Sequence, residues 1–179
     1  MYYGSNTRLH SVHGLKNLEE PEVLGSFQDR VRWYGAPEQL AADNAPVYRG
    51  NLFTKYLRDL YIRLWQCESY HQNQNKQERG WQQLKYGTNR LLDFSGAPRN
   101  FALLALIFYA FILNHTVDAS VGSGDMSPYM MATGWSDDIS ALMCFRFNEP
   151  VYCLVDSDHQ QFPSKSKEVR PVGLVYQKM

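Results

Sequence analysis

The chain has 179 residues, of which 44% are hydrophobic and 20% are charged, a balance that is ordinary for one soluble globular domain with a full core. Its 18 basic and 18 acidic residues cancel, which argues against a protein that binds nucleic acid by bulk charge attraction. Its three cysteines have no close spacing, which argues against a disulfide framework and predicts a reducing compartment.

Charge is distributed unevenly along the chain. Seven basic residues stand against three acidic ones between Lys55 and Arg90, whereas six acidic residues and only Arg146 occur between Asp125 and Asp158. Aromatic residues reach 14%, with twelve tyrosines and four tryptophans. These rings fit either a dense core, which we favour, or surfaces on which bases stack.

The N-terminal segment is predicted to hold a weak strand and then a helix. The strand lies within Tyr2–Val12, and the helix spans Glu19–Tyr34 and ends at Gly35. His10 and His13 are spaced like two metal ligands, but no CxxC motif accompanies them. We therefore favour a solvated or strand-edge histidine pair over a zinc site.

A strand, a helix and a second strand are predicted next. The first strand covers residues 38–42 after the turn Gly35-Ala36-Pro37 and ends at Asp43, a position where sites of α/β proteins form. The following helix is amphipathic, with apolar residues at Leu52, Phe53, Tyr56, Leu57 and Leu60. The second strand covers Tyr61–Cys67, and the amide-rich segment 68–77 is predicted to be a loop.

A long helix then begins near Glu78. Its predicted buried face carries Trp81, Leu84, Thr88, Leu91 and Leu92. Glu78, Gln82, Lys85 and Asn89 fall on the opposite face and form a polar stripe that could bind a metal at one end and phosphates further along. A simpler interpretation is also open, because an acidic residue in a first helical turn and an Asp-Asn pair after a strand are ordinary structural features.

The remaining elements are predicted from apolar runs and turn residues. A helix that is apolar all round starts near Asn100 and is expected to pack between the sheet and other elements; its run over Phe101–Leu113 is shorter than the ~20 residues of a membrane span. A short helix starts at Ser127-Pro128 and ends by Gly134. Two strands, over 150–155 and 169–176, complete the chain.

Taken together, several of these features resemble the catalytic core of a retroelement integrase, closest to the copia-type retrotransposons. The resemblance runs from about Gly35 to about Val155. It rests on residues that occur in the family's order, namely Gly35-Ala36-Pro37, Asp43-Asn44, the segment Tyr70–Arg79, Asp138-Ile139-Ser140 and Phe145.

The resemblance implies an α/β, ribonuclease H-like mixed sheet with flanking helices, and a site that holds two Mg²⁺ or Mn²⁺ ions with two aspartates and a glutamate. Asp43 matches the second aspartate and Glu78 the glutamate, although the spacing between them is one residue shorter than in the family. Asn75 and Arg79 match polar residues around the glutamate, and Gln82 and Lys85 would contact DNA ends. The first strand and its aspartate are expected to be missing, because the chain begins too late to contain them. Asp29, the only aspartate before Asp43, lies in a predicted helix only fourteen residues away and is a poor substitute.

The resemblance therefore implies a retrotransposon polyprotein fragment that integrates DNA by polynucleotidyl transfer and is inactive alone. Residues 1–145 would form the truncated core and residues 146–179 a β-strand extension. DNA is the expected partner, with a possible homo-oligomer, no membrane, and a location in the nucleus or in a cytoplasmic element particle. Two alternatives remain: a non-catalytic nucleic-acid-binding remnant, and a scaffold used only for oligomerisation or partner binding.

Overall fold

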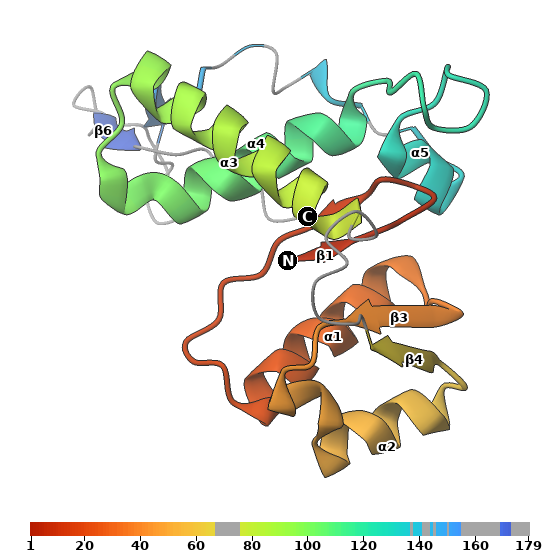
Figure 1. Cartoon of the computed structure of the whole chain (residues 1–179). Helices are drawn as coiled ribbons and strands as arrows, with labels where there is room; N and C mark the ends of the chain where they lie inside the picture. Colours follow the sequence, from red (N-terminus) through yellow and green to blue (C-terminus); the bar gives the residue numbers. More distant parts are fainter. Residues whose placement is uncertain are drawn as a thin grey trace, which may run out of the picture.

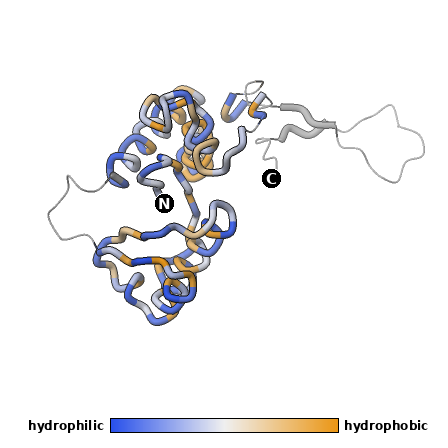
Figure 2. The backbone as a smooth tube through the Cα atoms, turned by 90° about the vertical axis from the view of Figure 1, so that its right-hand side faces the viewer, coloured by the Kyte–Doolittle hydropathy of each residue, from blue (hydrophilic) through white to orange (hydrophobic). Residues whose placement is uncertain are grey.

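The computed structural model describes residues 1–66, 76–136, 138–140, 144, 146–149, 151–154 and 169–172. Two halves make up most of it, one from residues 20–66 and one from residues 76–136, with a short N-terminal hairpin between them (Figure 1). Hydrophobic residues gather separately in each half (Figure 2). None of the described helices is long and apolar enough to cross a membrane.

The first half opens with helix α1, Glu20–Tyr34, as the sequence predicts. Pro21 stands in its first turn, where a missing backbone N–H costs nothing. Gly35 ends the helix at φ 80°, and its N–H donates to the Val31 carbonyl over 2.9 Å. Glycine suits this position because side chains disfavour positive φ.

A parallel pair of strands follows, connected by helices. Strand β3, Gln39–Ala42, is followed by the 3₁₀ helix η1, Pro46–Arg49, and by helix α2, Asn51–Asp59, before strand β4, Arg63–Gln66. The register runs from Gln39 opposite Arg63 to Ala42 opposite Gln66. The predicted elements are confirmed with shorter strands: Tyr61 lies in a turn at φ 55°, and Cys67 lies outside the described residues.

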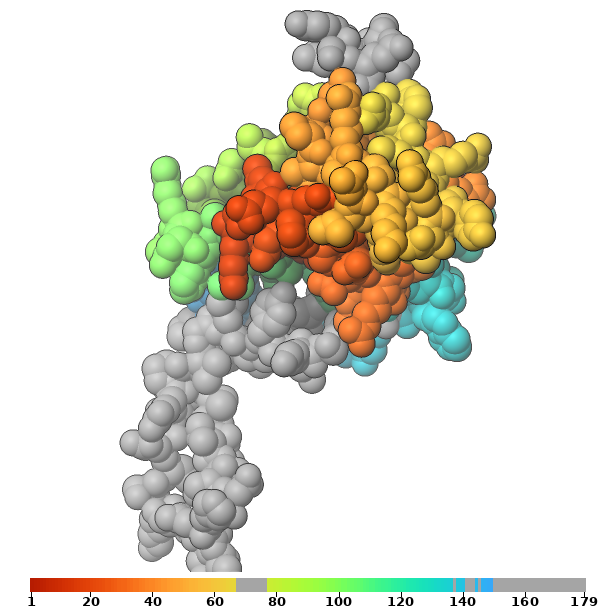
Figure 3. Space-filling model, turned by 90° about the horizontal axis from the view of Figure 1, so that it is seen from below, coloured from red at the N-terminus to blue at the C-terminus, as the bar shows by residue number. Residues whose placement is uncertain are grey.

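The core of this half is small and aromatic. Val23, Phe27, Phe53, Leu57 and Ile62 are buried together, and Leu40 and Leu64 pack against them from one face of the strand pair. The rings of Phe27 and Phe53 lie 5.5 Å apart, a separation typical of favourable aromatic pairs. Seen from below, this half covers much of the described surface (Figure 3).

The predicted N-terminal strand is a hairpin of two short strands. Strand β1, Tyr2–Tyr3, pairs antiparallel with strand β2, His10–Ser11. The buried Asn114 amide fixes the hairpin, because it accepts from the His10 N–H and donates to the His10 carbonyl, each over 2.8 Å. His10 is therefore in a strand, as one of the two sequence interpretations held, but it is buried rather than solvated.

The second half is built on two long helices that pack against each other, α3, Lys76–Ser95, and α4, Ala102–His115. The 3₁₀ helix η3, Arg99–Phe101, leads into α4. The buried side of α3 carries Gly80, Leu84, Gly87 and Thr88. The prediction that Trp81 is buried is wrong, since its side chain is 39% exposed. The two glycines let neighbouring rings approach the helix backbone and so turn Trp81 outward.

The prediction that α4 packs between the sheet and other elements is also wrong. Helix α4 contacts α3, β2 and a short helix α5, Pro128–Thr133. Leu103 and Ile112 of α4 remain exposed. The reason is that the parallel pair β3–β4 lies in the other half, so the main neighbours of α4 are helices and the N-terminal hairpin.

The C-terminal elements agree with the sequence where they are described. The Ser127 hydroxyl accepts from the Met130 N–H at the start of α5, and Gly134 ends the helix at φ 78°. Strand β5, Val151–Leu154, pairs antiparallel with strand β6, Val169–Val172. The predicted strands over 150–155 and 169–176 are confirmed in these shorter bounds.

The expectation that aromatic residues fill the core holds for some phenylalanines but for none of the tryptophans. Phe27 and Phe53 are fully buried. All four tryptophans are exposed at their side chains, namely Trp33, Trp65, Trp81 and Trp135.

Candidate functional site

Asp43 directly follows β3 rather than ending it. Ala42, the last residue of the strand, is buried, whereas Asp43 is exposed. One carboxylate oxygen of Asp43 accepts from the Ala45 N–H over 3.3 Å, which is a local turn interaction of the kind the sequence suggested as an alternative. The carboxylate thus stands at the carboxyl end of a parallel strand, where α/β folds place ligands.

A polar cluster at this strand end was not predicted from the sequence. The Arg49 guanidinium donates to the Asn44 side-chain oxygen and, over 3.4 Å, to the Gln66 side-chain oxygen. Gln66 ends β4 opposite Ala42. The parallel register therefore brings η1 and the two strand ends together beside Asp43. Asp43 is also among the groups that raise the pKa of Tyr48, after burial of that phenol.

Glu78 lies in the first turn of α3 and is exposed. The neighbouring Gln77 amide donates to the Met1 carbonyl over 3.0 Å. On the buried side of the same turn, Gly80 lies against the rings of Tyr3 and His10. The hairpin therefore holds the start of α3, and an acidic residue is favoured there by the helix dipole.

The polar stripe of α3 is exposed as predicted. Gln82, Lys85 and Asn89 share the solvent side with Glu78, and Arg79 is exposed beside them. Asn75 lies outside the described residues. The exposed stripe presents one carboxylate, two amides and a lysine on a single rigid element, a set that can contact phosphates through its donors.

The carboxylates of Asp43 and Glu78 are of the type that binds a divalent cation, but two carboxylates fill only part of the coordination shell of such an ion. Carboxylate oxygens such as those of Asp43 and Glu78 are the ligands that Mg²⁺ prefers. Over the described parts of the chain, however, no three or more histidine, cysteine, aspartate or glutamate side chains gather closely enough to hold a metal ion. Asp43 and Glu78 therefore belong to no group of this kind among the described residues.

No protein-family model matches the sequence, and no curated protein is similar to it at a significant level. Solved structures are similar in fold. A chain of the simian T-cell lymphotropic virus intasome matches with a TM-score of 0.58 and 20% identity, over 74% of this chain and 46% of that chain. At this identity the match is a likeness of fold.

Two isolated catalytic cores give the same result. The HTLV-2 integrase core in complex with magnesium, in a trimeric form, matches with a TM-score of 0.56 and 20% identity, over 73% of this chain and 80% of that chain. The BIV integrase core matches with a TM-score of 0.58 and 20% identity, over 74% and 82%. This chain spans less than half the length of the intasome chain.

The comparisons show a fold similar to that of solved integrase catalytic cores, in agreement with the predicted α/β class. The similar structures are retroviral, so the link to copia-type elements stays a prediction. The missing first strand also stays a prediction. Among the described residues, β3 and β4 pair only with each other. Within this fold, Asp43 follows β3 and Glu78 lies in the first turn of α3.

Proposed function

We propose that this chain is an integrase-core fragment of a retrotransposon polyprotein, made for DNA integration by metal-dependent polynucleotidyl transfer. The observation that carries the proposal is the placement of Asp43 after β3 and Glu78 in the first turn of α3 within a fold shared with integrase catalytic cores. Residues 1–145 would form the partial core and residues 146–179 its extension. The trimeric HTLV-2 core supports the idea of a homo-oligomer.

In this proposal Asp43 and Glu78 hold Mg²⁺ or Mn²⁺, and the HTLV-2 core in complex with magnesium supports that choice. When bound there, such a cation would activate the attacking oxygen and stabilise the leaving oxygen at phosphorus. Arg79, Gln82 and Lys85, exposed along α3, together with Asn75, would contact the DNA backbone and orient its end. Two carboxylates without a third are a weaker ligand set than the family uses, so the chain by itself should not join DNA strands.

The first test measures metal binding and activity in the same protein. Titration with Mn²⁺, followed by paramagnetic broadening, should detect a site that Asp43→Asn or Glu78→Gln weakens about tenfold or more, because each substitution removes a charged ligand. Asp59→Asn is the matched control, since Asp59 is an exposed carboxylate on α2. It should leave Mn²⁺ binding unchanged.

Strand-transfer and end-processing assays with the same proteins complete this test. No joining is expected from the unmodified chain with either cation. Joining that Glu78→Gln abolishes would contradict the proposed inactivity. Mn²⁺ binding that ignores Asp43 and Glu78 would contradict their proposed roles.

A second candidate is a nucleic-acid-binding remnant in which the chemistry is lost. The exposed Arg79 and Lys85 on a helix with only one acidic residue in its first turn favour it. DNA binding that weakens with salt, persists in a chelator and is lost in Arg79→Ala with Lys85→Ala would select this candidate.

A further inference from the structure

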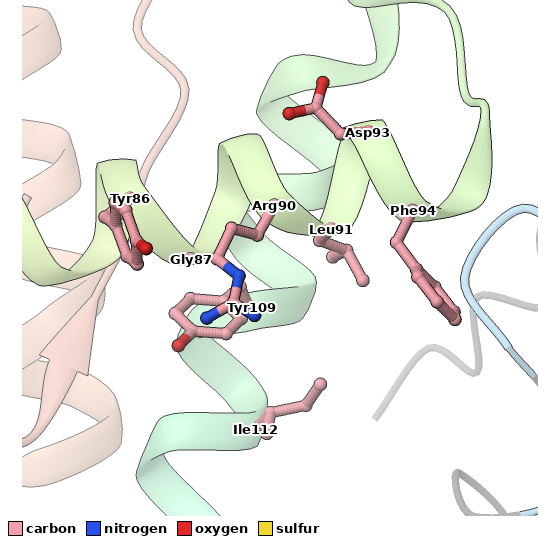
Figure 4. Close-up of a pocket in the computed structure, with 8 residues that line it drawn as sticks. All are labelled: Tyr86, Gly87, Arg90, Leu91, Asp93, Phe94, Tyr109 and Ile112. Carbon is pink, nitrogen blue, oxygen red and sulfur yellow. The ribbon is translucent and has the colours of Figure 1, made fainter.

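An open groove lies between α3 and α4, at the end of α3 away from Glu78. Its volume is about 700 Å³. The residues that line it are Tyr86, Gly87, Arg90, Leu91, Asp93, Phe94, Tyr109 and Ile112. Figure 4 shows side chains of α3 along one side and those of α4 along the other.

The groove exposes large aromatic side chains. Tyr86 is 67% exposed and Phe94 is 83% exposed, and both project from α3. Ile112 of α4 is also exposed. Rings held on a rigid helix lose little conformational entropy when a planar group stacks on them.

Arg90 lies midway between Tyr86 and Phe94 in the sequence and on the same side of α3. The Arg90 guanidinium lies 5.7 Å from the centre of the Tyr86 ring, within the range of a cation–π contact. This contact orients the guanidinium beside the ring while leaving Arg90 exposed. The groove therefore offers an aromatic platform with a positive charge at its middle.

The same pattern extends towards the start of α3. Arg79, Gln83, Tyr86, Arg90 and Phe94 recur every three or four residues and are all exposed. They share one side of the helix and form a basic and aromatic stripe that covers about 22 Å at 1.5 Å per residue. The stripe borders the polar stripe of Glu78, Gln82, Lys85 and Asn89.

We propose that this basic and aromatic stripe and its groove bind single-stranded nucleic acid. Bases stack on Tyr86 and Phe94, and Arg90 and Arg79 contact the phosphates. Single strands are favoured over duplexes because paired bases already stack on each other and offer no free faces. An apolar peptide fits less well, since it would have to desolvate Arg90 without a compensating charge.

Asp93 is the feature that opposes binding. It lines the groove one turn from Arg90, with its carboxylate turned away from Tyr109 and Ile112 (Figure 4). A negative charge at that distance repels a phosphate backbone. Asp93→Asn is therefore expected to strengthen binding, a change in the direction opposite to that of the other variants.

The test is fluorescence anisotropy with a labelled oligothymidylate of about 15 nucleotides, in a chelator, so that it does not depend on Asp43 or Glu78. Tyr86→Ala and Phe94→Ala should each weaken binding by about fivefold to a hundredfold, the range expected for a stacked base. Arg90→Ala should also weaken it and lower the slope of the salt dependence by about 0.7, because one phosphate then keeps its counterion. Phe94→Tyr should restore binding, because it keeps the ring.

Trp33→Ala is the matched control, because Trp33 is 65% exposed on α1, outside the groove. Thermal unfolding verifies that each variant is folded. Equal binding by the wild type, Tyr86→Ala and Phe94→Ala would overturn the proposal, as would equal affinity for a duplex of the same length. So would a groove variant that changes only the oligomeric state by light scattering, which would place a second copy there.

This proposal shares with the proposed function the nucleic-acid class of substrate and Arg79. The variants of Tyr86, Arg90 and Phe94 are therefore the ones that decide it. Loss of Mn²⁺ binding in Glu78→Gln with unchanged oligothymidylate binding supports both. If the groove variants leave oligothymidylate binding unchanged while Mn²⁺ binding depends on Glu78, the proposal for the groove is overturned and the proposed function is not.

Discussion

Gly87 shows how one residue sets the approach of two helices. A Cβ atom at this position would overlap with ring atoms of Tyr109 on α4. Gly25, in the interior of α1, has nothing within 4 Å of a Cβ placed there. The two glycines occupy the same secondary structure and differ only in what surrounds them.

Substituting alanine at each position should therefore give opposite results. Gly25→Ala is expected to stabilise the protein by about 0.5–1 kcal/mol, because alanine restricts the unfolded chain and favours a helix. Gly87→Ala is expected to destabilise it by roughly 1–3 kcal/mol through overpacking against Tyr109. Urea unfolding midpoints measure both changes, and a stabilising Gly87→Ala would show that the ring does not pack on the helix.

At the scale of elements, the docking of the hairpin on α3 and α4 depends on a buried histidine. His10 is 5% exposed, its ring lies 5.0 Å from that of Tyr3, and its Nδ1 has no hydrogen-bond partner among the described residues. Burial lowers the pKa of His10 from 6.5 to about 4, because a charged ring would lose its hydration.

This shift makes the stability of the fold sensitive to mild acid. The neutral ring contributes fully above the unfolded pKa of about 6.5, and the contribution falls as the pH decreases towards 4, where the folded form also takes up a proton. We expect the free energy of unfolding of His10→Phe to decrease less than that of the wild type when the pH is lowered from about 7 to about 4.5. Urea unfolding at several pH values measures this difference.

His13→Phe is the comparison for that experiment. Burial also lowers the pKa of His13, but this residue is only half-buried. Its Nε2 is hydrogen-bonded to the Ser11 hydroxyl over 2.7 Å. Its effect on the pH dependence should be smaller. Identical pH profiles for wild type and His10→Phe would show that His10 is solvated in the folded protein.

At the scale of the whole molecule, β1 joins the two halves because consecutive strand residues face opposite sides. The Tyr2 hydroxyl lies 2.8 Å from the Ser26 hydroxyl and donates to the Val23 carbonyl of α1 over 3.2 Å. The Tyr3 ring instead lies against Gly80 of α3. Two adjacent tyrosines thus hold a helix from each half.

Removing Tyr2 should uncouple the halves. In Tyr2→Ala, amides of α1 and α2 are expected to lose protection from hydrogen exchange about tenfold or more relative to those of α3 and α4, because that half keeps only its own small core. Exchange followed by mass spectrometry measures this. Tyr61→Ala is the control, since Tyr61 is 91% exposed, and equal losses in both halves would contradict the idea.

The spacing of nearby residues was enough to predict the helices but not the contacts that each one makes with distant parts of the chain. The helices α1, α2, α3, α4 and α5 follow from apolar spacing and from Pro21, Gly35 and Gly134, which act on nearby backbone alone. The exposed side of α3 was also predictable, because Glu78, Gln82, Lys85 and Asn89 are spaced for one face. The Arg49 contacts with Asn44 and Gln66 were not, since they require the β3 and β4 ends to meet.

The amino-acid sequence by itself determined the order of helices and strands, the two candidate carboxylates and the polar face of α3, because each depends on residues only a few positions apart. The tertiary structure decided that Trp81 faces outward, that α4 packs against α3, β2 and α5 rather than against β3 and β4, and that Tyr86, Arg90 and Phe94 border a groove with Tyr109 and Ile112. These features depend on which distant surfaces pack together, and helical periodicity carries no information about the partner of a face.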